Sequence, residues 1–363
     1  MDTLSQRRRF KLAMTKANPF KSASALEALG LLPTGAAKSL ATVTDRYAVA
    51  ITPEMAALID PTNANDPIGR QFLPTIEEGI TTPEEHADPI GDAAFSPVKG
   101  IVHRYPDRVL LKLLHICPVY CRFCFRREVV GPKGAGTLSA KATARAFDYI
   151  SANPDIWEVI LTGGDPFMLS SRRIAEVTGA LSVIEHVKVV RWHTRVPIVD
   201  PGRITPTFAR ALRTPGKATF IGIHANHPNE FTPSARDAIA RLADAGLQLV
   251  SQTVLLKGIN DNAETLERLM RLFVENRIQP YYLHHTDLAP GTSHFRTSIA
   301  EGQTLMRALR GRLSGLAQPR YVIDIPGGHG KVPIGPSYLD ETGGEISITD
   351  YLGQSHQYPD ASS

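Results

Sequence analysis

All three cysteines of this 363-residue chain fall within one short segment, at Cys117, Cys121 and Cys124. Three thiolates in CxxxCxxC spacing can hold three irons of a [4Fe–4S] cluster, and without a fourth cysteine the last iron stays open for another ligand. An open iron lets a cluster do chemistry as well as carry electrons. The alternatives are a zinc knuckle and buried structural cysteines, but zinc normally takes four ligands in paired spacing, and His115 stands too close to Cys117 to serve easily as the fourth. The spacing therefore favours an iron–sulfur cluster.

The cysteine spacing, followed by Phe125-Arg126-Arg127, resembles the radical S-adenosylmethionine (SAM) superfamily and, within it, the lysine 2,3-aminomutase family. The resemblance runs from about His103 to Pro336. It implies that the methionine moiety of SAM chelates the open iron, and that an electron from the cluster cleaves SAM to a 5′-deoxyadenosyl radical. An electron donor such as flavodoxin or ferredoxin is then expected.

Composition and charge argue against several classes of protein. The formal charge of +4, from 40 basic and 36 acidic residues, is too small and too dispersed to indicate nucleic-acid binding. The one compact basic run, Arg7-Arg8-Arg9, is interpreted as a solvated helix face. We expect no secretory signal and no membrane span, since no stretch reaches the ~18 apolar residues that a span needs. Closely spaced, metal-bound thiols suit a reducing compartment, so the sequence predicts a cytoplasmic protein.

Hydrophobic patterning divides the chain into three parts. Residues 1–95 lack strand patterning and predict an α-helical N-terminal region. Residues 96–300 alternate apolar runs with amphipathic helices, and residues 301–363 form a short C-terminal extension with a glycine-rich loop and a polar tail from 354 to 363. Helices in the first part are expected to begin near Leu4, near Ala23, and near Pro53 with Thr52 as N-cap.

The central part predicts an α/β fold with six strands. The expected strands are 109–116, 158–162, 187–192, 218–224, 247–255 and 278–283. Expected helices between them run from Ser139 to Ala152, from Thr232-Pro233 to Ala245-Gly246, and from Asn262 to Asn276. Six βα units predict a parallel sheet with right-handed crossovers, either open or curved into a partial barrel. The radical SAM resemblance favours a partial (β/α)6 barrel.

Polar residues follow the predicted strands repeatedly, and in barrel folds the chemistry sits at these carboxyl ends. They are the cysteines after the first strand, Gly163-Gly164-Asp165 after the second, His193 after the third, His224-Ala-Asn226-His227 after the fourth, Gln252 late in the fifth and His284-His285-Thr-Asp287 after the sixth. Without a family, a strand-end histidine or glutamine is more often a structural hydrogen-bonding group.

Three of these strand-end segments resemble SAM contacts of the family. Two adjacent glycines let the backbone approach a ligand closely, and Gly163-Gly164-Asp165 resembles the segment that binds the methionyl amino group of SAM. His224 and Gln252 stand where the aminomutase family contacts SAM. The resemblance therefore implies a SAM site made from these residues.

A second motif is the glycine-rich loop from Pro326 to Lys331, Pro-Gly-Gly-His-Gly-Lys. It lacks the GxxxxGKS/T pattern and does not open a helix, so a nucleotide P-loop is not predicted. A lysine on a flexible loop suits covalent attachment to a carbonyl compound. The loop resembles the family segment PGGGGKxP, whose lysine binds pyridoxal 5′-phosphate (PLP), with His329 in place of one glycine. The resemblance implies that Lys331 is the catalytic residue that holds PLP.

The phosphate of PLP needs cations. The segment around Arg104, Tyr105 and Arg108 corresponds to the one that supplies Arg and Tyr contacts to PLP in the family. A surface ion-pair cluster is the simpler interpretation, and such clusters usually contribute little. With Lys331 present, the sequence favours Arg104, Tyr105 and Arg108 as cofactor contacts.

Three charged residues bear on the substrate. Arg126 matches the family arginine that pairs with the substrate α-carboxylate, and a planar guanidinium can bind a carboxylate through two hydrogen bonds. Asp287 and Asp324 match the two aspartates that hold the ε-ammonium of lysine, and paired carboxylates suit a buried ammonium. The resemblance implies a small amino-acid substrate, with L-lysine preferred over glutamate. We therefore expect an isomerase that interconverts L-lysine and β-lysine.

Alternatives stay open at this stage. The chain has no cysteines to spare for the structural zinc of the best-known lysine aminomutases, so zinc-linked assembly is not expected, whereas a homo-oligomer of another kind is left open. The short form is similar to relatives that make (R)-β-lysine for elongation factor P, and a related radical SAM enzyme acting on another amino acid is a further alternative. A radical SAM enzyme without PLP would leave Lys331 without a role. A non-catalytic metal-binding module would leave the strand-end residues unexplained.

Overall fold

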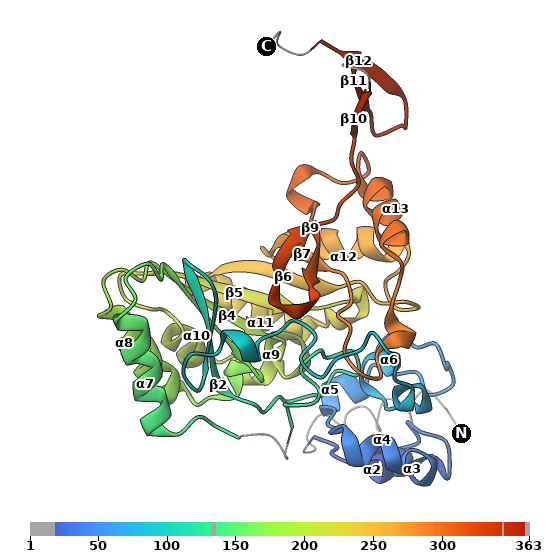
Figure 1. Cartoon of the computed structure of the whole chain (residues 1–363). Coiled ribbons are helices and arrows are strands. Elements are labelled where there is room, and N and C mark those ends of the chain that lie inside the picture. Colours follow the sequence, from blue (N-terminus) through green and yellow to red (C-terminus); the bar gives the residue numbers. More distant parts are fainter. Residues whose placement is uncertain (1–18, 132–135, 343–344, 360–363) are drawn as a thin grey trace.

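The computed structural model describes residues 19–131, 136–342 and 345–359 (Figure 1). Its centre is a nine-stranded sheet in which every strand lies beside the one that follows it in the chain. The strands are β1 Ile101–Tyr105, β2 Arg108–Leu114, β3 Glu158–Gly163, β4 Val189–Thr194, β5 Ala218–His224, β6 Gln248–Val254, β7 Gln279–His284, β8 Arg320–Ile325 and β9 Gly330–Pro333. Strands β2 to β8 are parallel, whereas β1 and β9 pair antiparallel at the two edges. The expected partial barrel is confirmed.

Helices connect the strands and cover the outer face of the sheet (Figure 1). They include α7 Ala140–Ser151, α8 Ser171–Ser182, α9 Val196–Val199, α10 Pro206–Ala211, α11 Pro233–Asp244, α12 Ala263–Glu275 and α13 Ile299–Leu309. The predicted N-caps are confirmed, because Ser139, Thr232 and Asn262 each accept a backbone N–H from three residues further on. No helix among the described residues is long and apolar enough to cross a membrane.

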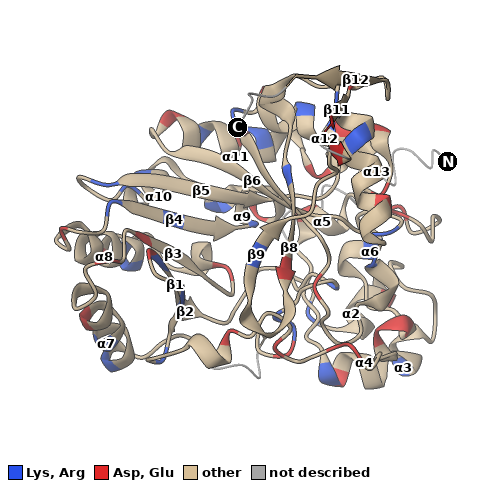
Figure 2. Ribbon diagram, turned by 45° about the horizontal axis from the view of Figure 1, so that its top comes forward, with Lys and Arg blue, Asp and Glu red and all other residues tan. Residues whose placement is uncertain are grey.

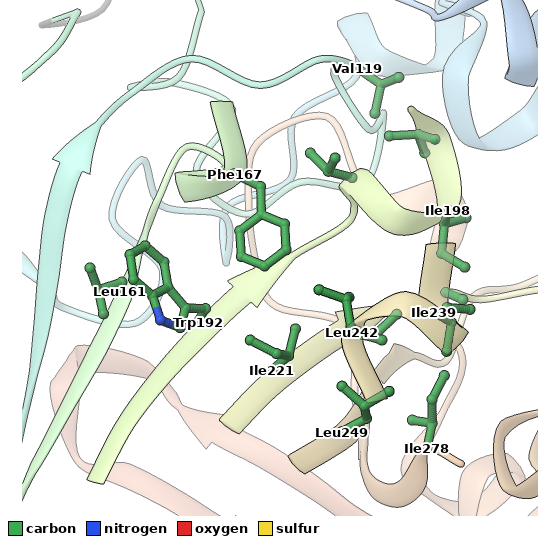
Figure 3. Close-up of a cluster of buried hydrophobic side chains, with 14 of the residues drawn as sticks. Val119, Leu161, Phe167, Trp192, Ile198, Ile221, Ile239, Leu242, Leu249 and Ile278 are labelled. Carbon is green, nitrogen blue, oxygen red and sulfur yellow. The ribbon is translucent and has the colours of Figure 1, made fainter. Parts of the chain in front are cut away.

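Buried apolar side chains fill the space between the strands and these helices. Leu161, Trp192, Ile221 and Leu249 extend from β3, β4, β5 and β6, and Ile239 on α11 belongs to the same buried cluster (Figure 3). Full burial of each large aliphatic side chain stabilises the fold by about 1.5–3 kcal/mol. This core fixes the strand ends from which the candidate site is built.

The N-terminal region consists of short helices packed on the barrel. They are α2 Ala23–Ala28, α3 Ala36–Ser39, α4 Ala41–Arg46, α5 Pro53–Ala56 and α6 Gly69–Phe72, with the 3₁₀ turns η1 Ile76–Gly79 and η2 Ala93–Phe95. The helix starts expected near Ala23 and Pro53 are confirmed, and Thr52 caps α5 through the Met55 N–H. The helix expected near Leu4 and the run Arg7-Arg8-Arg9 lie outside the described residues.

The C-terminal segment differs from the expected polar tail. Strands β10 Leu339–Thr342, β11 Glu345–Thr349 and β12 Ser355–Tyr358 form an antiparallel sheet that projects from the rest of the molecule (Figure 1). Residues 355–358, expected as tail, are therefore a strand. Acidic and basic residues are interspersed over the helices and strands, as the small net charge implies (Figure 2).

Candidate active site

The cysteine loop follows β2, and its three thiols line one cavity together with Tyr120 and Val130. Burial raises the pKa of the Cys117 thiol well above its usual value and raises the pKa of Cys124 to about 11. Within the described ranges, no three His, Cys, Asp or Glu side chains converge closely enough to hold a single metal ion. Three thiols that line one cavity are suited to serve as the cysteine ligands of an iron–sulfur cluster.

Buried ion pairs attach the cysteine loop to the N-terminal region. The Glu78 carboxylate in η1 is fully buried and accepts hydrogen bonds from the guanidinium groups of Arg122 and Arg127. Burial alone would raise the pKa of Glu78, but the two guanidinium groups outweigh it and lower that pKa. Arg122 also donates to the Ala48 carbonyl at 2.8 Å, and the Arg127 guanidinium lies 3.5 Å from the centre of the Tyr47 ring.

The two glycines after β3 meet the chain that leads into the cysteine loop. The Gly164 N–H donates to the Leu114 carbonyl at 2.7 Å, and the Asp165 N–H donates to the Ile116 carbonyl at 3.0 Å. A Cβ on Gly164 would collide with the Ile116 backbone, and Gly163 has φ +111°. The close approach that the sequence predicted is thus made to residues 114–116, directly before Cys117.

The Asp165 carboxylate is turned into the fold. It accepts hydrogen bonds from the Thr194 hydroxyl at 2.8 Å and from the Arg195 N–H at 2.7 Å. Burial raises the pKa of Asp165 although these donors act to lower it. The side chain therefore ties β3 to the end of β4.

His224 and Gln252 face each other as register partners at the ends of β5 and β6. Burial, with smaller contributions from His284 and two arginines, lowers the pKa of His224 to about 3, so its ring is neutral at physiological pH. The Gln252 Oε1 lies 2.5 Å from the His284 Nε2. Since an amide oxygen can only accept, Nε2 carries the proton and the His284 Nδ1 is left as an acceptor.

Lys331 on β9 lies beside this pair. Its Nζ is 3.1 Å from the His284 Nδ1 and forms an ion pair with Asp324 on β8. The Lys331 backbone N–H donates to the Tyr105 hydroxyl at 2.7 Å, and the Arg108 guanidinium stacks 3.8 Å from the centre of the Tyr105 ring. The structure thus brings Tyr105, Arg108 and Lys331 together across the two edges of the sheet.

The loop before Lys331 explains why a histidine is accepted at one position of a glycine-rich segment. Gly327, Gly328 and Gly330 have φ values of +81°, +86° and +93°, which favour glycine. His329 has φ −73° and its side chain is exposed. The substitution at 329 therefore strains neither the loop nor the surroundings of Lys331.

Three cations surround one carboxylate near the cysteine loop. The Arg126 Nη2 and the Lys112 Nζ lie 3.0 and 3.5 Å from the Asp92 Oδ2, and the Arg104 Nη2 lies 3.2 Å from Oδ1. Burial acts to raise the pKa of Asp92, but Arg126, Lys112 and Arg104 together lower it. Arg104 also donates to the Ile90 carbonyl at 2.5 Å, so it joins Arg126 rather than Tyr105 and Arg108.

Asp287 and Asp324 are electrostatically coupled. Burial, and then the charge of Asp324, raise the pKa of Asp287 to about 7. Burial also acts to raise the pKa of Asp324, but the His284 ring, whose Nδ1 lies 3.8 Å from the carboxylate, and the Lys331 ammonium lower it to about 2. Arg126 and Asp92 also influence the pKa of Asp287, so the cation cluster lies near enough to the acid pair for their charges to interact.

Two protein families match this chain. The radical SAM superfamily matches residues 111–273, and a lysine-2,3-aminomutase family matches residues 306–361. The L-lysine 2,3-aminomutase of Fusobacterium nucleatum is 40% identical over 291 residues, which cover 80% of this chain and 68% of the relative. The chain belongs to the lysine 2,3-aminomutase family. It is an isomerase of the radical SAM superfamily.

Other members of the family differ in the substrate that their names state. The L-lysine 2,3-aminomutase of Methanococcus maripaludis is 40% identical over 311 residues, covering 85% of this chain and 71% of the relative. The glutamate 2,3-aminomutase of Clostridioides difficile is 37% identical over 303 residues, covering 84% and 70%. Family membership therefore establishes an aminomutase, and the substrate has to be argued from the site.

Members of the lysine 2,3-aminomutase family use a [4Fe–4S] cluster, SAM and PLP, and the residues present fit these groups. Three thiols around one cavity provide the thiolates that a cluster with an open iron needs. The half-buried Lys331 ammonium, next to the neutral His284 and the stacked Tyr105 and Arg108, offers an amine and a cation to a phosphorylated aldehyde.

Sequence analysis missed several residues that hold the site together. They are Gln71, Glu78, Asp92, Arg195 and Glu230. Each makes a contact between segments far apart in the chain, and such contacts leave no spacing pattern in a single sequence. Arg122 lies inside the cysteine motif, but only the fold reveals its partner Glu78.

Proposed function

We propose that this protein is an L-lysine 2,3-aminomutase, which moves the α-amino group of L-lysine to the neighbouring carbon to give β-lysine. The observation that carries the proposal is the opposite excess of charge at the two ends of one site. Arg104, Lys112 and Arg126 surround a single carboxylate, that of Asp92, and leave an excess of positive charge. That end suits the α-carboxylate of an amino acid.

The other end of the site suits an ammonium group. There the Lys331 ammonium pairs with Asp324, and its charge also acts on Asp287. When Lys331 is engaged with the cofactor, its charge no longer balances the pair, and the ε-ammonium of lysine would replace it. A glutamate side chain would instead bring a third carboxylate beside two others, which is unfavourable in a buried site.

We assign the cofactor contacts as follows. Cys117, Cys121 and Cys124 ligate the cluster, and Lys331 binds PLP with Tyr105 and Arg108 as contacts, whereas Arg104, which the sequence also favoured as a cofactor contact, pairs with Asp92 beside Arg126. Gly163, Gly164, Asp165, His224 and Gln252 form the SAM site. The positions of His224 and Gln252 at the ends of paired strands support this assignment, whereas the Asp165 carboxylate is taken up by Thr194 and Arg195 and leaves only the backbone of its segment for SAM.

When bound, the cluster and SAM supply hydrogen-atom abstraction and PLP carries the migrating nitrogen. The chain itself binds and orients. Arg126 fixes the α-carboxylate, Asp287 and Asp324 fix the distal ammonium, and a substrate held at both ends presents a defined carbon to the reacting groups. His284 is neutral, and its Nδ1 faces the Nζ of Lys331. It therefore holds the Lys331 amine toward the cofactor.

We further propose that the enzyme works in the cytoplasm with an electron donor such as flavodoxin or ferredoxin. We also propose that it forms a homo-oligomer through the C-terminal sheet β10–β12. The proposed oligomer is supported by large apolar side chains that are exposed on and beside this sheet, namely Leu339, Tyr351, Leu352 and Tyr358. Size-exclusion chromatography with light scattering checks this, because a chain that stays monomeric at every concentration would contradict it.

The test of function is a comparison of amino acids. Protein reconstituted without oxygen with iron, sulfide, PLP and SAM is reduced with dithionite and incubated with L-lysine, L-glutamate, L-arginine or L-ornithine, and β-amino acids are quantified by mass spectrometry. We expect kcat/KM for L-lysine to exceed that for each of the others by at least about tenfold, which corresponds to about 1.4 kcal/mol. Equal or faster conversion of glutamate would contradict the substrate assignment.

A further inference from the structure

A buried arginine lies directly against one of the cysteine sulfurs. Arg195 follows β4 and is almost completely buried. Its Nη1 donates toward the Cys121 Sγ at 3.0 Å. No strand-end or spacing pattern singled this residue out, and it is not among the residues assigned above to SAM, PLP or substrate.

The other side of the Arg195 guanidinium is held rigidly. Its Nη2 donates to the Gln71 Oε1 at 2.5 Å and to the Glu230 Oε2 at 2.7 Å. The guanidinium also lies 4.7 Å from the centre of the Phe72 ring and 5.6 Å from that of Phe123. A guanidinium is planar, so fixing Nη2 between two acceptors also fixes the direction in which Nη1 points.

The backbone around Arg195 is fixed by the same network. The Arg195 N–H donates to Asp165, directly after the glycines that meet the cysteine loop. The Glu230 Oε1 accepts the backbone N–H groups of Asn226 and His227, which follow β5. Arg195 thus connects the ends of β3, β4 and β5 to Cys121.

We propose that Arg195 raises the reduction potential of the cluster by hydrogen bonding to Cys121. The proposal rests on the assignment of the cluster to Cys117, Cys121 and Cys124. Hydrogen bonds to cluster sulfurs and nearby positive charge stabilise the reduced, more negative state. The electron comes from the external donor, which is oxidised as the cluster is reduced, and Arg195 acts as a positioning residue that neither gains nor loses an electron.

Glu230 limits the size of this effect. Its carboxylate is fully buried and balances the charge of Arg195, so the influence on the cluster comes mainly from the N–H directed at sulfur. We therefore expect removal of Arg195 to shift the equilibrium between oxidised and reduced cluster toward the oxidised form by roughly tenfold, which is about 59 mV for a one-electron couple.

The test is a redox titration of the reconstituted full-length protein, followed by electron paramagnetic resonance. The variants are Arg195→Gln, Arg195→Lys and the double variant Arg195→Gln with Glu230→Gln, which avoids an unpaired buried carboxylate. Arg203→Gln is the matched control, since Arg203 donates to the carbonyls of Phe167 and Met168. Iron and sulfide content are measured first for every protein.

We expect the clusters to form and the midpoint potential to become more negative in Arg195→Gln and in the double variant, with Arg195→Lys in between and Arg203→Gln unchanged. An unchanged potential in cluster-loaded Arg195→Gln would overturn the proposal. Failure of both Gln variants to load a cluster would also overturn it, because Arg195 would then be needed for assembly and not for tuning. A parent protein without a cluster would instead contradict the assignment of the cysteines.

Discussion

The cysteine loop and the loop that carries Lys331 belong to one site but are held in different ways. The cysteine loop is fixed by buried ion pairs, since Glu78 holds Arg122 and Arg127. Lys331 lies on the edge strand β9, is half-buried, and has an ammonium group that pairs with Asp324. The difference fits two tasks, because a cluster needs fixed ligands whereas the lysine has to exchange partners when cofactor and substrate bind.

The largest effect is expected from a change in the cysteine loop. Cys121→Ala removes one iron ligand, so the cluster should be lost and cleavage of SAM should fall below detection. Iron content and 5′-deoxyadenosine formation under dithionite measure this. Covalent attachment of PLP to Lys331 should persist, because β9 belongs to a separate segment. A variant that forms 5′-deoxyadenosine at the parent rate would remove Cys121 from the cluster site.

In the loop that carries the cofactor lysine, Lys331→Ala should abolish covalent attachment of PLP and leave the iron–sulfur absorption in place. Borohydride reduction followed by peptide mapping locates the modified lysine in the parent protein. Mapping of PLP to another lysine would contradict the role of Lys331. Loss of the cluster in Lys331→Ala would contradict the claim that the cysteine loop and the Lys331 loop hold their cofactors independently.

Glu78→Gln tests how much the buried ion pairs that hold the cysteine loop stabilise the protein. Removing one partner of a buried ion pair leaves uncompensated charge, so we expect a loss of about 3–5 kcal/mol in the free energy of unfolding. Glu128→Gln is the control, because the Arg46–Glu128 pair is partly exposed and its loss should cost about 1 kcal/mol or less. Chemical denaturation measures both. Equal losses in the free energy of unfolding of the two variants would show that the buried ion pairs stabilise the protein no more than the partly exposed pair does.

Asp287→Asn should have the smallest effect, because the pKa of Asp287 is raised to about 7 and the carboxyl is only partly ionised at neutral pH. Lysine affinity in the parent should increase as pH rises through about 7, since ionised Asp287 pairs with the ammonium. The variant should lose this pH dependence and bind lysine about tenfold more weakly at pH 8, a difference of about 1.4 kcal/mol. Binding titrations at pH 6, 7 and 8 check this, and a pH dependence that survives in Asp287→Asn would contradict it.

The same pKa has a consequence for stability without ligand. The pKa of Asp287 is higher in the folded than in the unfolded chain, so the unfolded state releases its proton first and stability falls as pH rises from about 4 to about 7. The stability of Asp287→Asn relative to the parent should therefore increase as the pH rises from about 4 to about 7. The variant should remain the more stable protein at higher pH. Thermal unfolding at pH 4.5 and 8 distinguishes the two proteins.

The sequence predicts the parallel part of the fold well because most of its strands are rich in apolar and β-branched residues and alternate with helical segments. The strand at 218–224 is found as β5 with the same bounds, and the other five predicted strands differ by two residues or fewer at every end. Strands β1, β8 and β9 were missed. β1 carries polar residues on an edge, and β9 contains Gly330 and Pro333, which weaken a strand pattern.

The candidate site divides in the same way. Residues in local motifs, such as Cys117 and Lys331, could be singled out from their spacing. Asp92 could not, because it lies on a loop and meets Arg126 only in the folded chain. Buried networks between distant segments require the three-dimensional structure, and they determine how firmly each end of the site is held.

Transfer of isotopic label tests the central claim most directly. L-lysine labelled with nitrogen-15 at its α-amino group is incubated with the reconstituted enzyme, SAM and dithionite, and the product is analysed by NMR. The account predicts β-lysine with the labelled nitrogen on the third carbon, at a rate well above β-glutamate formation from L-glutamate. Label that stays on the second carbon of lysine in an enzyme that cleaves SAM, or preferential conversion of glutamate, would contradict it.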